Sequence, residues 1–215
     1  MTQPTTTLRQ RIARRLLQLV GWEVDPYIPP PAKYVLIVAP HTSNWDFPYG
    51  YLGKMALGLQ LHWVGKHTLF RWPYGWLMRW LGGIPVDRRS RNNVIQQLAD
   101  VFARRERLVI AITPEGTRSY TPNWKSGFYY TALAAKVPLA MGYIDYRRKR
   151  MGISEPFLPS GDLEADLEHI RAFYADKIGR YPEKTGEIRI LSRPADQGPA
   201  PEAARSGRPQ EAVHS

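Results

Sequence analysis

Short apolar runs alternate with stretches of helical length along most of this chain, and this pattern limits the possible folds more than any other feature. The apolar runs occupy residues 34–39, 61–64, 84–86, 108–112 and 138–143. The stretches with a helical pattern occupy residues 45–57, 74–81, 92–104, 126–136 and 162–178. Short apolar runs of this kind are typical of strands in a buried sheet. We therefore predict an α/β layer fold with a mixed, largely buried sheet flanked by helices.

The chain has 215 residues, a length that suits one sizeable domain and hardly allows two. Hydrophobic residues make up 43% of it, which indicates a globular core. Prolines in residues 26–33 exclude a helix there, so we interpret this stretch as a linker. We predict a helical segment at residues 1–25 and a folded domain at residues 26–193. Pro, Ala, Gly, Ser and charged residues dominate residues 194–215, which predicts a disordered tail.

The first predicted helix is amphipathic and strongly basic. Over residues 7–22 its apolar side chains form one stripe, made of Leu8, Ile12, Leu16 and Leu19. Four arginines surround the stripe, and no acidic residue precedes Glu23. Two interpretations are open. The segment is a surface helix docked on its own domain, as in most soluble proteins, or it lies in a membrane interface, where each arginine near anionic lipid adds about 1 kcal/mol.

The charge and the absence of cysteine narrow the chemistry. Thirty Lys and Arg against 19 Asp and Glu give a formal net charge of +11 and a pI near 10.0. This excess predicts an anionic partner: nucleic acid, lipid headgroups, phosphate or an acidic protein. Without cysteine there is no disulfide, thiolate metal site or cysteine nucleophile. No apolar run approaches the roughly 18 residues of a membrane span, and the N-terminus has no signal-peptide pattern, so we expect a cytoplasmic protein.

The sequence HTSNWD at residues 41–46 follows directly on the first predicted strand. His41 is therefore placed at the carboxyl end of a strand, where α/β folds assemble their sites. Asp46 comes five positions later, so the two side chains meet only if His41 lies in the loop and Asp46 in the first turn of the next helix. A structural role is the alternative, since Ser43 and Asp46 resemble a helix-capping pair.

Two further polar loops follow predicted strands. TPEGTRS, at residues 113–119, combines Glu115 with a glycine for close backbone approach and with Arg118, whose guanidinium can bind phosphate oxygens. VDRRSR, which starts at Val86, contributes Arg88, Arg89 and Arg91. Each loop alone is an ordinary turn or a solvated charge run. Three such loops, one with a potential base and two with arginines, predict a site that binds an anionic substrate and moves a proton.

In this order and at this separation, HTSNWD, GGIPVDR and PEGTRS resemble the first three motifs of the glycerolipid acyltransferase superfamily, which includes the 1-acylglycerol-3-phosphate acyltransferases. The resemblance covers residues 41–142 and rests on the combination, which is more specific than any single motif. Thr113 stands where many members have phenylalanine. The fourth motif keeps only the first of two prolines, Pro138, and this departure concerns the apolar part of the site. The chain resembles a compact bacterial-type member.

The resemblance implies a glycerophosphate-acyltransferase-like layer fold and a reaction. A fatty acyl group would pass from a thioester, either acyl-CoA or acyl-ACP (acyl carrier protein), to the hydroxyl of a lysophospholipid or related lipid acceptor, with no metal or other cofactor. His41 would act as general base, and Asp46 would orient its ring. The remaining site residues implied by the resemblance bind the acceptor: Arg88, Glu115, Gly116, Thr117 and Arg118. With a lipid acceptor, the basic N-terminal helix would bind an anionic membrane surface, and the enzyme would lie peripherally on the inner face of the cell membrane.

Other activities fit the same residues. The protein could be a lipid transacylase, which needs no thioester, or an acyltransferase for an acceptor without phosphate. An inactive scaffold that binds acyl carrier protein is a further alternative, which the intact motif residues disfavour. The charge alone would also suit a nucleic-acid-binding protein. Zinc-finger spacing, an RNP-type aromatic motif and a Gly-x-x-Gly clamp are missing from the sequence, so we expect no nucleic-acid partner.

Several conspicuous residues have simpler structural interpretations. Lys125 follows the third motif and could contact a headgroup, but an exposed lysine at a helix start is the simpler explanation. His62 and His67 have no carboxylate at a matching spacing, so we interpret them as structural or surface residues and expect no metal site. The simplest role for a tryptophan cluster is core packing, whereas exposed members would suit an interface belt or an acyl groove. The cluster consists of Trp63, Trp72, Trp76 and Trp80.

Overall fold

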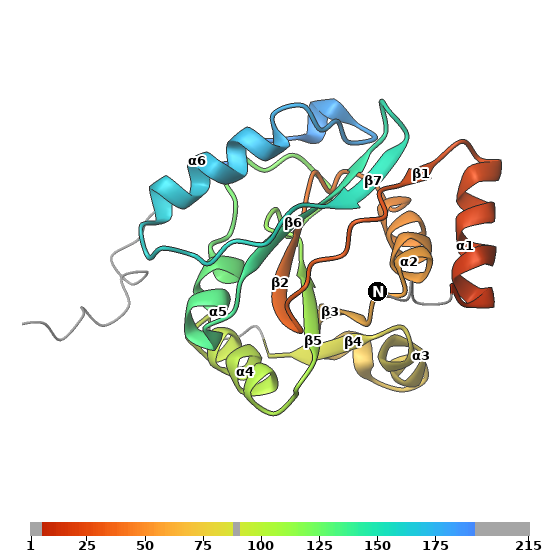
Figure 1. Cartoon of the computed structure of the whole chain (residues 1–215). Helices are drawn as coiled ribbons and strands as arrows, with labels where there is room; N and C mark the ends of the chain where they lie inside the picture. Colours follow the sequence, from red (N-terminus) through yellow and green to blue (C-terminus); the bar gives the residue numbers. More distant parts are fainter. Residues whose placement is uncertain (1–5, 88–90, 192–215) are drawn as a thin grey trace, which may run out of the picture.

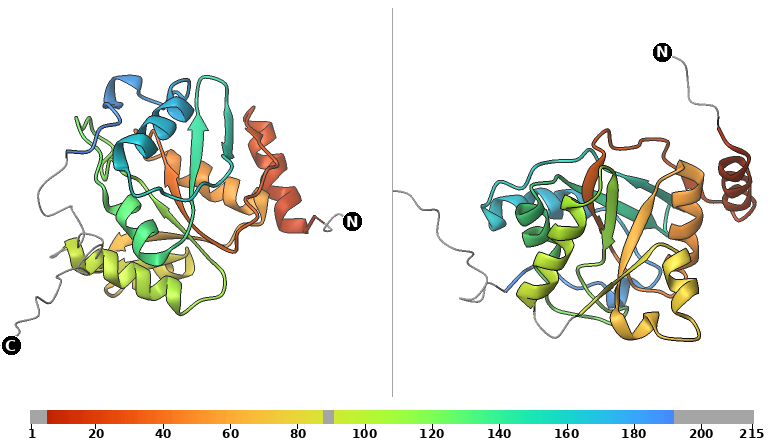
Figure 2. Two further views of the ribbon diagram at one scale, coloured as in Figure 1. Left: turned by 60° about the vertical axis from the view of Figure 1, so that its left-hand side comes forward. Right: turned by 90° about the horizontal axis from the view of Figure 1, so that it is seen from below.

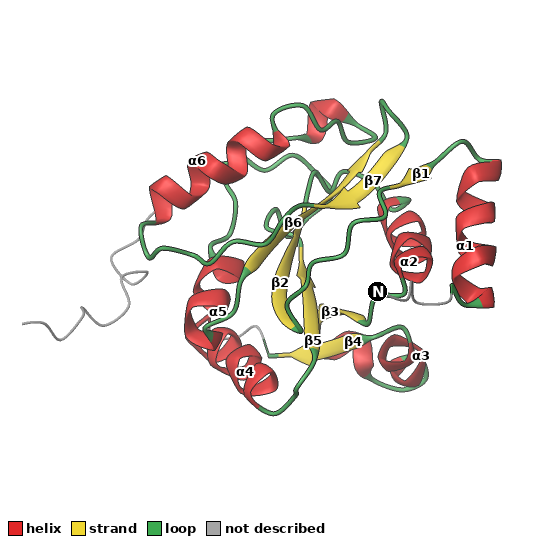
Figure 3. Cartoon of the chain, viewed as in Figure 1, coloured by secondary structure: helices red, strands yellow, loops and turns green. Residues whose placement is uncertain are grey.

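A computed structural model describes residues 6–87 and 91–191, and within them seven strands form one mixed sheet (Figure 1, Figure 3). The strands are β1 (Glu23–Val24), β2 (Lys33–Val38), β3 (Leu61–Lys66), β4 (Gly83–Val86), β5 (Leu108–Ile112), β6 (Leu139–Asp145) and β7 (Arg150–Ile153). Their order is β1-β7-β6-β2-β5-β3-β4. The five strands from β6 to β4 are parallel, whereas β7 is antiparallel to β6 and parallel to β1. The predicted mixed α/β sheet is confirmed.

Helices follow the strands at the predicted places. They are α1 (Leu8–Leu19), α2 (Asp46–Leu57), α3 (Gly75–Trp80), α4 (Arg91–Ala103), α5 (Gly127–Ala135) and α6 (Leu163–Tyr174), with the 3-10 helices η1 (His67–Phe70) and η2 (Pro182–Lys184). Only β1 and β7 were not predicted. β1 has two residues, and β7 begins with an arginine and contains a glycine, so neither forms an apolar run. Residues 194–215, the predicted tail, lie outside the described part of the chain.

The direction of the crossovers decides which helices cover which face of the sheet. From β2 to β3 and on to β4 the chain moves across the sheet in one direction, and from β4 to β5 to β6 it moves back. Crossovers between parallel strands are right-handed, so this reversal puts α2 and α3 on one face and α4 and α5 on the other. Figures 1 and 2 show α1 on the side of α2 and α3, and α6 on the side of α4 and α5.

The central strand β2 is buried on both faces, which explains its continuous apolar run. Val35 and Ile37 pack with residues of α4, α5 and α6. Tyr34 and Leu36 point to the opposite face and pack with Leu57 of α2. A strand that is covered on both sides needs no polar alternation, and its sequence therefore resembles a short buried run.

Helix α1 docks on α2, but through a face other than the predicted apolar stripe. Ala13 and Leu17 are fully buried against α2, and Arg14 Nε donates a hydrogen bond to the carbonyl of Ala56 at 3.1 Å. The stripe itself is exposed in all four positions: Leu8, Ile12, Leu16 and Leu19. α1 is thus a surface helix docked on its own domain, as the first interpretation has it, and its stripe stays outside the contact. Among the described residues, none of the helices is both long and apolar enough to cross a membrane.

The tryptophan cluster is also distributed differently from the simplest interpretation. Trp63 is half-buried on β3, but Trp72, Trp76 and Trp80 are 93%, 70% and 71% exposed. Core packing is therefore wrong for these three residues. The buried aromatic ring of this segment belongs to Phe70 of η1 and lies 5.8 Å from the Trp63 ring.

Candidate active site

Two neighbouring strands bring the first and third motifs to one edge of the sheet. Ile37 of β2 pairs with Ile112 of β5, so the two parallel strands end at the same level. The chain then leaves β2 for α2 on one face and β5 for α5 on the other face. Open α/β sheets bind their ligands where adjacent connections diverge in this way. His41 follows β2 at this point, and Glu115 follows β5.

His41 and Asp46 form a directly bonded pair. His41 lies in the loop after β2, and Asp46 is the first residue of α2, which is the arrangement that their spacing requires. His41 Nδ1 lies 3.0 Å from Asp46 Oδ2. Because Nδ1 is held by the carboxylate, Nε2 is the ring nitrogen that remains for proton transfer. The imidazole side chain is 16% exposed and the Asp46 side chain 3%, so the pair is accessible from the side of the histidine.

The Asp46 carboxylate is held by two further donors. Oδ2 also accepts a hydrogen bond from the backbone N–H of Ser43 at 2.9 Å, which retains part of the predicted capping interaction. Oδ1 accepts a hydrogen bond from the hydroxyl of Tyr146 at 2.7 Å. The carboxylate also lies at the amino end of α2, where the helix dipole favours a negative charge. These contacts fix Asp46 in a buried position and leave one orientation for the His41 ring.

Tyr146 was not recognised as a site residue in the sequence. It lies in the turn between β6 and β7, 100 positions beyond Asp46, and no local pattern connects the two. Its ring packs edge to face on Trp22, which follows α1, with 5.0 Å between the ring centroids. Burial, together with the hydrogen bond to Asp46, raises the pKa of the Tyr146 hydroxyl far above its usual value. The hydroxyl therefore stays protonated and acts as a donor to the carboxylate.

Glu115 binds the backbone next to the histidine. Its Oε1 accepts a hydrogen bond from the His41 N–H at 3.0 Å, so the third motif holds the first motif in place. The other oxygen, Oε2, is buried and has no hydrogen-bond partner among the described residues. Burial raises the pKa of the Glu115 carboxyl, although the N–H groups of Glu115 and His41 oppose this effect. Glu115 thus has one oxygen in a structural contact and one unused.

The rest of the third motif forms an exposed loop beside Glu115. Gly116 has a φ angle of +66°, and a Cβ there would come within 2.5 Å of Lys125 Nζ, so a side chain is excluded both by the backbone and by the lysine. Lys125 is exposed, as its simpler interpretation requires, yet its ammonium lies over the motif. Thr117 and Arg118 are exposed beside it. Arg88 of the second motif lies outside the described residues.

The C-terminal part of the chain completes the rim of the site. The guanidinium of Arg180 lies over three aromatic rings, 5.6 Å from Trp45, 5.9 Å from Tyr146 and 5.8 Å from Tyr181. The backbone N–H of Tyr181 donates to Thr42 Oγ1 at 3.2 Å. An exposed cation is thereby held next to the residues that support Asp46. The sequence gives no sign of this contact, because more than 130 residues separate Thr42 from Tyr181.

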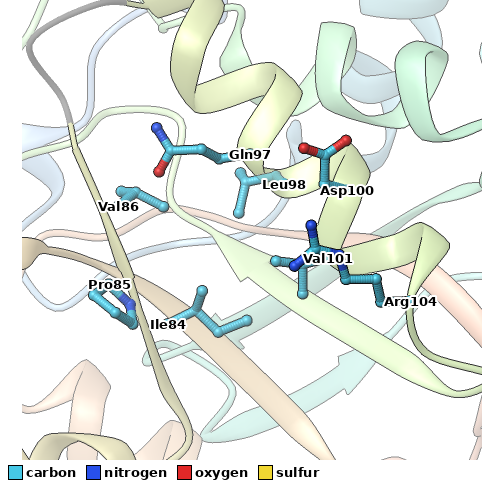
Figure 4. A pocket seen from close by; sticks show the side chains of 8 residues that line it. All are labelled: Ile84, Pro85, Val86, Gln97, Leu98, Asp100, Val101 and Arg104. Atoms are coloured by element: carbon cyan, nitrogen blue, oxygen red, sulfur yellow. The ribbon is translucent and has the colours of Figure 1, made fainter.

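A separate hollow of about 260 Å³ lies between β4 and α4 (Figure 4). Its lining combines apolar and polar side chains: Ile84, Pro85, Val86, Gln97, Leu98, Asp100, Val101 and Arg104. It contains neither His41 nor Asp46 nor Glu115. The chemistry of the motifs is therefore located at the strand ends and not in this hollow.

Comparisons with known proteins identify the family of the chain. The sequence profile of the Acyltransferase family matches residues 24–142, more than half of the chain, and this range includes His41, Asp46 and Glu115. No curated protein is significantly similar in sequence. Among solved structures, the chain is similar to the 1-acyl-sn-glycerophosphate (LPA) acyltransferase PlsC from Thermotoga maritima. That match has 20% identity and a TM-score of 0.48, and it covers 78% of this chain and 73% of that chain.

Proposed function

Because this chain belongs to the Acyltransferase family, we propose that it transfers a fatty acyl group from a thioester to the hydroxyl of a lysophospholipid or a related lipid acceptor. The observation that carries the proposal is the bonded pair of His41 and Asp46, 3.0 Å apart at the carboxyl end of β2. A histidine whose Nδ1 is fixed by a buried carboxylate is suited to removing a proton through Nε2.

In the proposed reaction, His41 Nε2 takes the proton from the acceptor hydroxyl as its oxygen attacks the thioester carbon. The new C–O bond gives a tetrahedral intermediate, and its collapse breaks the C–S bond. The proton on His41 then passes to the departing thiolate, which leaves as the free thiol of coenzyme A or acyl carrier protein. Asp46 stabilises the imidazolium that forms in between, and Ser43 and Tyr146 hold Asp46 in position. The acceptor oxygen is itself the nucleophile, so no acylated side chain is needed.

The exposed cations around the dyad support an acceptor that carries a phosphate group. Arg118 lies on the loop of the third motif, and the ammonium of Lys125 lies over this loop. Arg180 lies over the rings of Trp45 and Tyr146. We propose that Arg88 and Arg118 bind the phosphate, since guanidinium groups bind phosphate oxygens in pairs. Gly116 and Thr117 would shape the loop around the acceptor's glycerol end, and Glu115 fixes this loop to the backbone of His41.

We also propose that α1 holds the protein on an anionic membrane surface from which the lipid acceptor is taken. Its exposed stripe points away from the face that docks on α2, since Ala13 and Leu17 are the buried positions. Arg9 and Arg15 are exposed on the same helix. An amphipathic helix with apolar residues outward and arginines beside them is typical of helices that lie in a membrane interface. The protein would then be peripheral, with the site close to the lipid.

Thioester consumption tests the proposed reaction. The purified protein is given acyl-CoA or acyl-ACP together with a panel of lysolipids, and the products are identified by mass. We expect His41→Ala to lower turnover by about 10²- to 10⁴-fold, the range typical of a general base. His169→Ala is the matched control, because His169 is exposed on α6, away from the motifs.

Equal turnover in the wild type and in His41→Ala would refute the role of His41. Product formation from a lipid donor without any thioester would identify a transacylase instead, and acylation of lipids without phosphate would remove the role of the arginines.

A further inference from the structure

The segment between β3 and β4 presents an unusual number of large apolar side chains to solvent. We call this surface the α3 aromatic patch and define it by Leu69, Trp72, Tyr74, Trp76 and Trp80, all of which are at least half exposed. Trp76 and Trp80 are one helical turn apart on α3 and share a face. Exposed apolar clusters on this scale mark interaction surfaces, whereas single exposed residues need no explanation.

The segment that carries the patch packs tightly around Phe70. Phe70 is buried in the same segment, and three glycines make room for its ring and backbone: a Cβ at Gly65 or Gly83 would come within 3 Å of the Phe70 ring, and one at Gly75 would overlap its carbonyl. Arg79 stacks over the same ring at 5.7 Å and donates to the Phe70 carbonyl. Phe70 is thus packed inside the protein, whereas the side chains of the patch are exposed.

The charge around the patch selects the kind of partner. From Phe47 to Val86 the sequence contains no aspartate or glutamate. The same stretch contains four cationic residues: Lys54, Lys66, Arg71 and Arg79. Lys66 and Arg71 are exposed next to the aromatic side chains. A surface that combines tryptophan and tyrosine with uncompensated positive charge is complementary to an anionic lipid surface, because these rings prefer the headgroup region and the cations are attracted by the lipid charge.

We propose that the α3 aromatic patch is a second membrane contact, which inserts into the headgroup region of anionic lipid. The inference rests on the proposed function, in which the acceptor is a membrane lipid. Figures 1 and 2 show that α3 lies on the same side of the sheet as α1, the first proposed membrane contact. The patch supplies a lipid contact on the β4 side of α2, and α1 supplies one on the other side.

A row of aromatic rings connects the patch with the dyad. The Trp63 ring lies 5.8 Å from Phe70 and 6.1 Å from Phe47, and Phe47 is the residue after Asp46. Trp45 and Phe47 are both partly exposed at the start of α2. Apolar rings therefore link the patch to the start of α2, partly inside the protein, since Phe70 is buried and Trp63 is half-buried.

The absence of cysteine allows a position-specific test. Trp76→Cys and Leu158→Cys each introduce a single thiol, which is labelled with a dye whose fluorescence increases in an apolar environment. The two residues are equally exposed, 70% in both cases, but Leu158 lies in the segment before α6. The full-length labelled proteins are mixed with vesicles of phosphatidylcholine and phosphatidylglycerol in equal parts. We expect the label at position 76 to brighten and to shift to shorter wavelength, and the label at position 158 to stay unchanged.

A second measurement keeps the test independent of the label. Trp72→Ala/Trp76→Ala/Trp80→Ala is compared with Leu158→Ala/Leu191→Ala in sedimentation with the same vesicles. We expect the first variant to bind about tenfold more weakly or worse and the second to bind as the wild type does. All the substituted side chains are exposed, so both variants are expected to keep the fold, which circular dichroism checks.

Three results would overturn the inference. The first is a label at position 76 that stays in water while the protein sediments with vesicles. The second is an equal response of both labels, and the third is a response of the label at position 76 to protein concentration without vesicles, which would indicate a second copy as the partner. The proposed function fails by a different result, the absence of thioester turnover, and that assay does not depend on either label.

Discussion

Helices α1 and α6 invite comparison, because they have the same length and opposite surroundings. Each has 12 residues, and each begins with a side-chain cap, from Thr7 in α1 and from Asp162 in α6. α6 turns its apolar residues to the sheet and buries Leu167, Ile170 and Tyr174. α1 buries only Ala13 and Leu17, and its larger apolar stripe remains exposed.

The difference shows that an apolar stripe reveals an interface but not its partner. The charges on the polar faces distinguish the two helices. α6 has two acidic residues in its first turn, and Arg171 is paired with Glu164 at 2.6 Å and with Glu168 at 3.1 Å. α1 has no acidic residue, and its arginines have none to pair with on the same helix. Mixed charges suit contact with water, whereas charges of one sign suit an oppositely charged surface.

The largest expected effect is a difference in the free energy of unfolding between one substitution in α6 and one in α1. Ile170→Ala removes a fully buried side chain and should lower the free energy of unfolding by about 2–5 kcal/mol. Ile12→Ala removes an exposed one and should change that free energy by less than about 0.5 kcal/mol. Urea unfolding measures both, and vesicle sedimentation should weaken only for Ile12→Ala. A stability loss of similar size in both variants would mean that the stripe of α1 is covered by protein in solution.

Two tyrosines give the next contrast. Tyr146, which packs on Trp22 beyond α1, donates to the Asp46 carboxylate, whereas Tyr174 of α6 donates to the carbonyls of Ile37 and Gly142. A hydrogen bond to a charged group contributes about 1.5–3 kcal/mol, so Tyr146→Phe should lower kcat about tenfold or more with little change in KM. Tyr174→Phe should instead lower stability by about 1–2 kcal/mol and leave kcat nearly unchanged. Steady-state kinetics and urea unfolding of both variants measure these effects. An unchanged kcat in Tyr146→Phe would show that Asp46 does not need the hydrogen bond from Tyr146.

The smallest effect concerns single surface charges. Arg15→Gln on α1 should weaken binding to phosphatidylglycerol vesicles about fivefold at low salt, since one arginine near an anionic surface contributes about 1 kcal/mol. Glu164→Gln on α6 removes an exposed ion-pair partner of Arg171 and should leave vesicle binding unchanged, with a stability loss of less than about 0.5 kcal/mol. Sedimentation at several salt concentrations provides the comparison. Equal behaviour of the two variants would remove the distinction between the helices.

Local patterns were sufficient for most of the fold and for the central pair of the site. Apolar runs located five of the seven strands, among them the central strands β2, β5 and β6, whose residues are mostly buried. The spacing of His41 and Asp46 contained the condition for their contact, a loop residue and a first-turn residue, and the structure meets it. Both features depend on residues that are close together in the sequence, and a local sequence pattern contains this information.

Contacts between distant segments could not be read in the same way. Tyr146 reaches Asp46 only because β6 lies next to β2, and Arg180 reaches Trp45 only because the chain returns to the strand ends after α6. The three exposed tryptophans were misplaced for a related reason. Tryptophan suits a core as well as a membrane interface, and the sequence does not show that Phe70 is the aromatic residue of this segment that is buried.

The uneven placement of acidic residues makes the molecule an electric dipole. Helices α1, α2 and α3 contain Asp46 as their one carboxylate, whereas residues 162–187 have seven: Asp162, Glu164, Asp166, Glu168, Asp176, Glu183 and Glu187. Near an anionic bilayer such a molecule experiences a torque as well as an attraction, within the roughly 8 Å over which charges act at physiological ionic strength. It would rotate before it touches, so that most encounters with such a bilayer would start with the side of α1 and α3 already facing it.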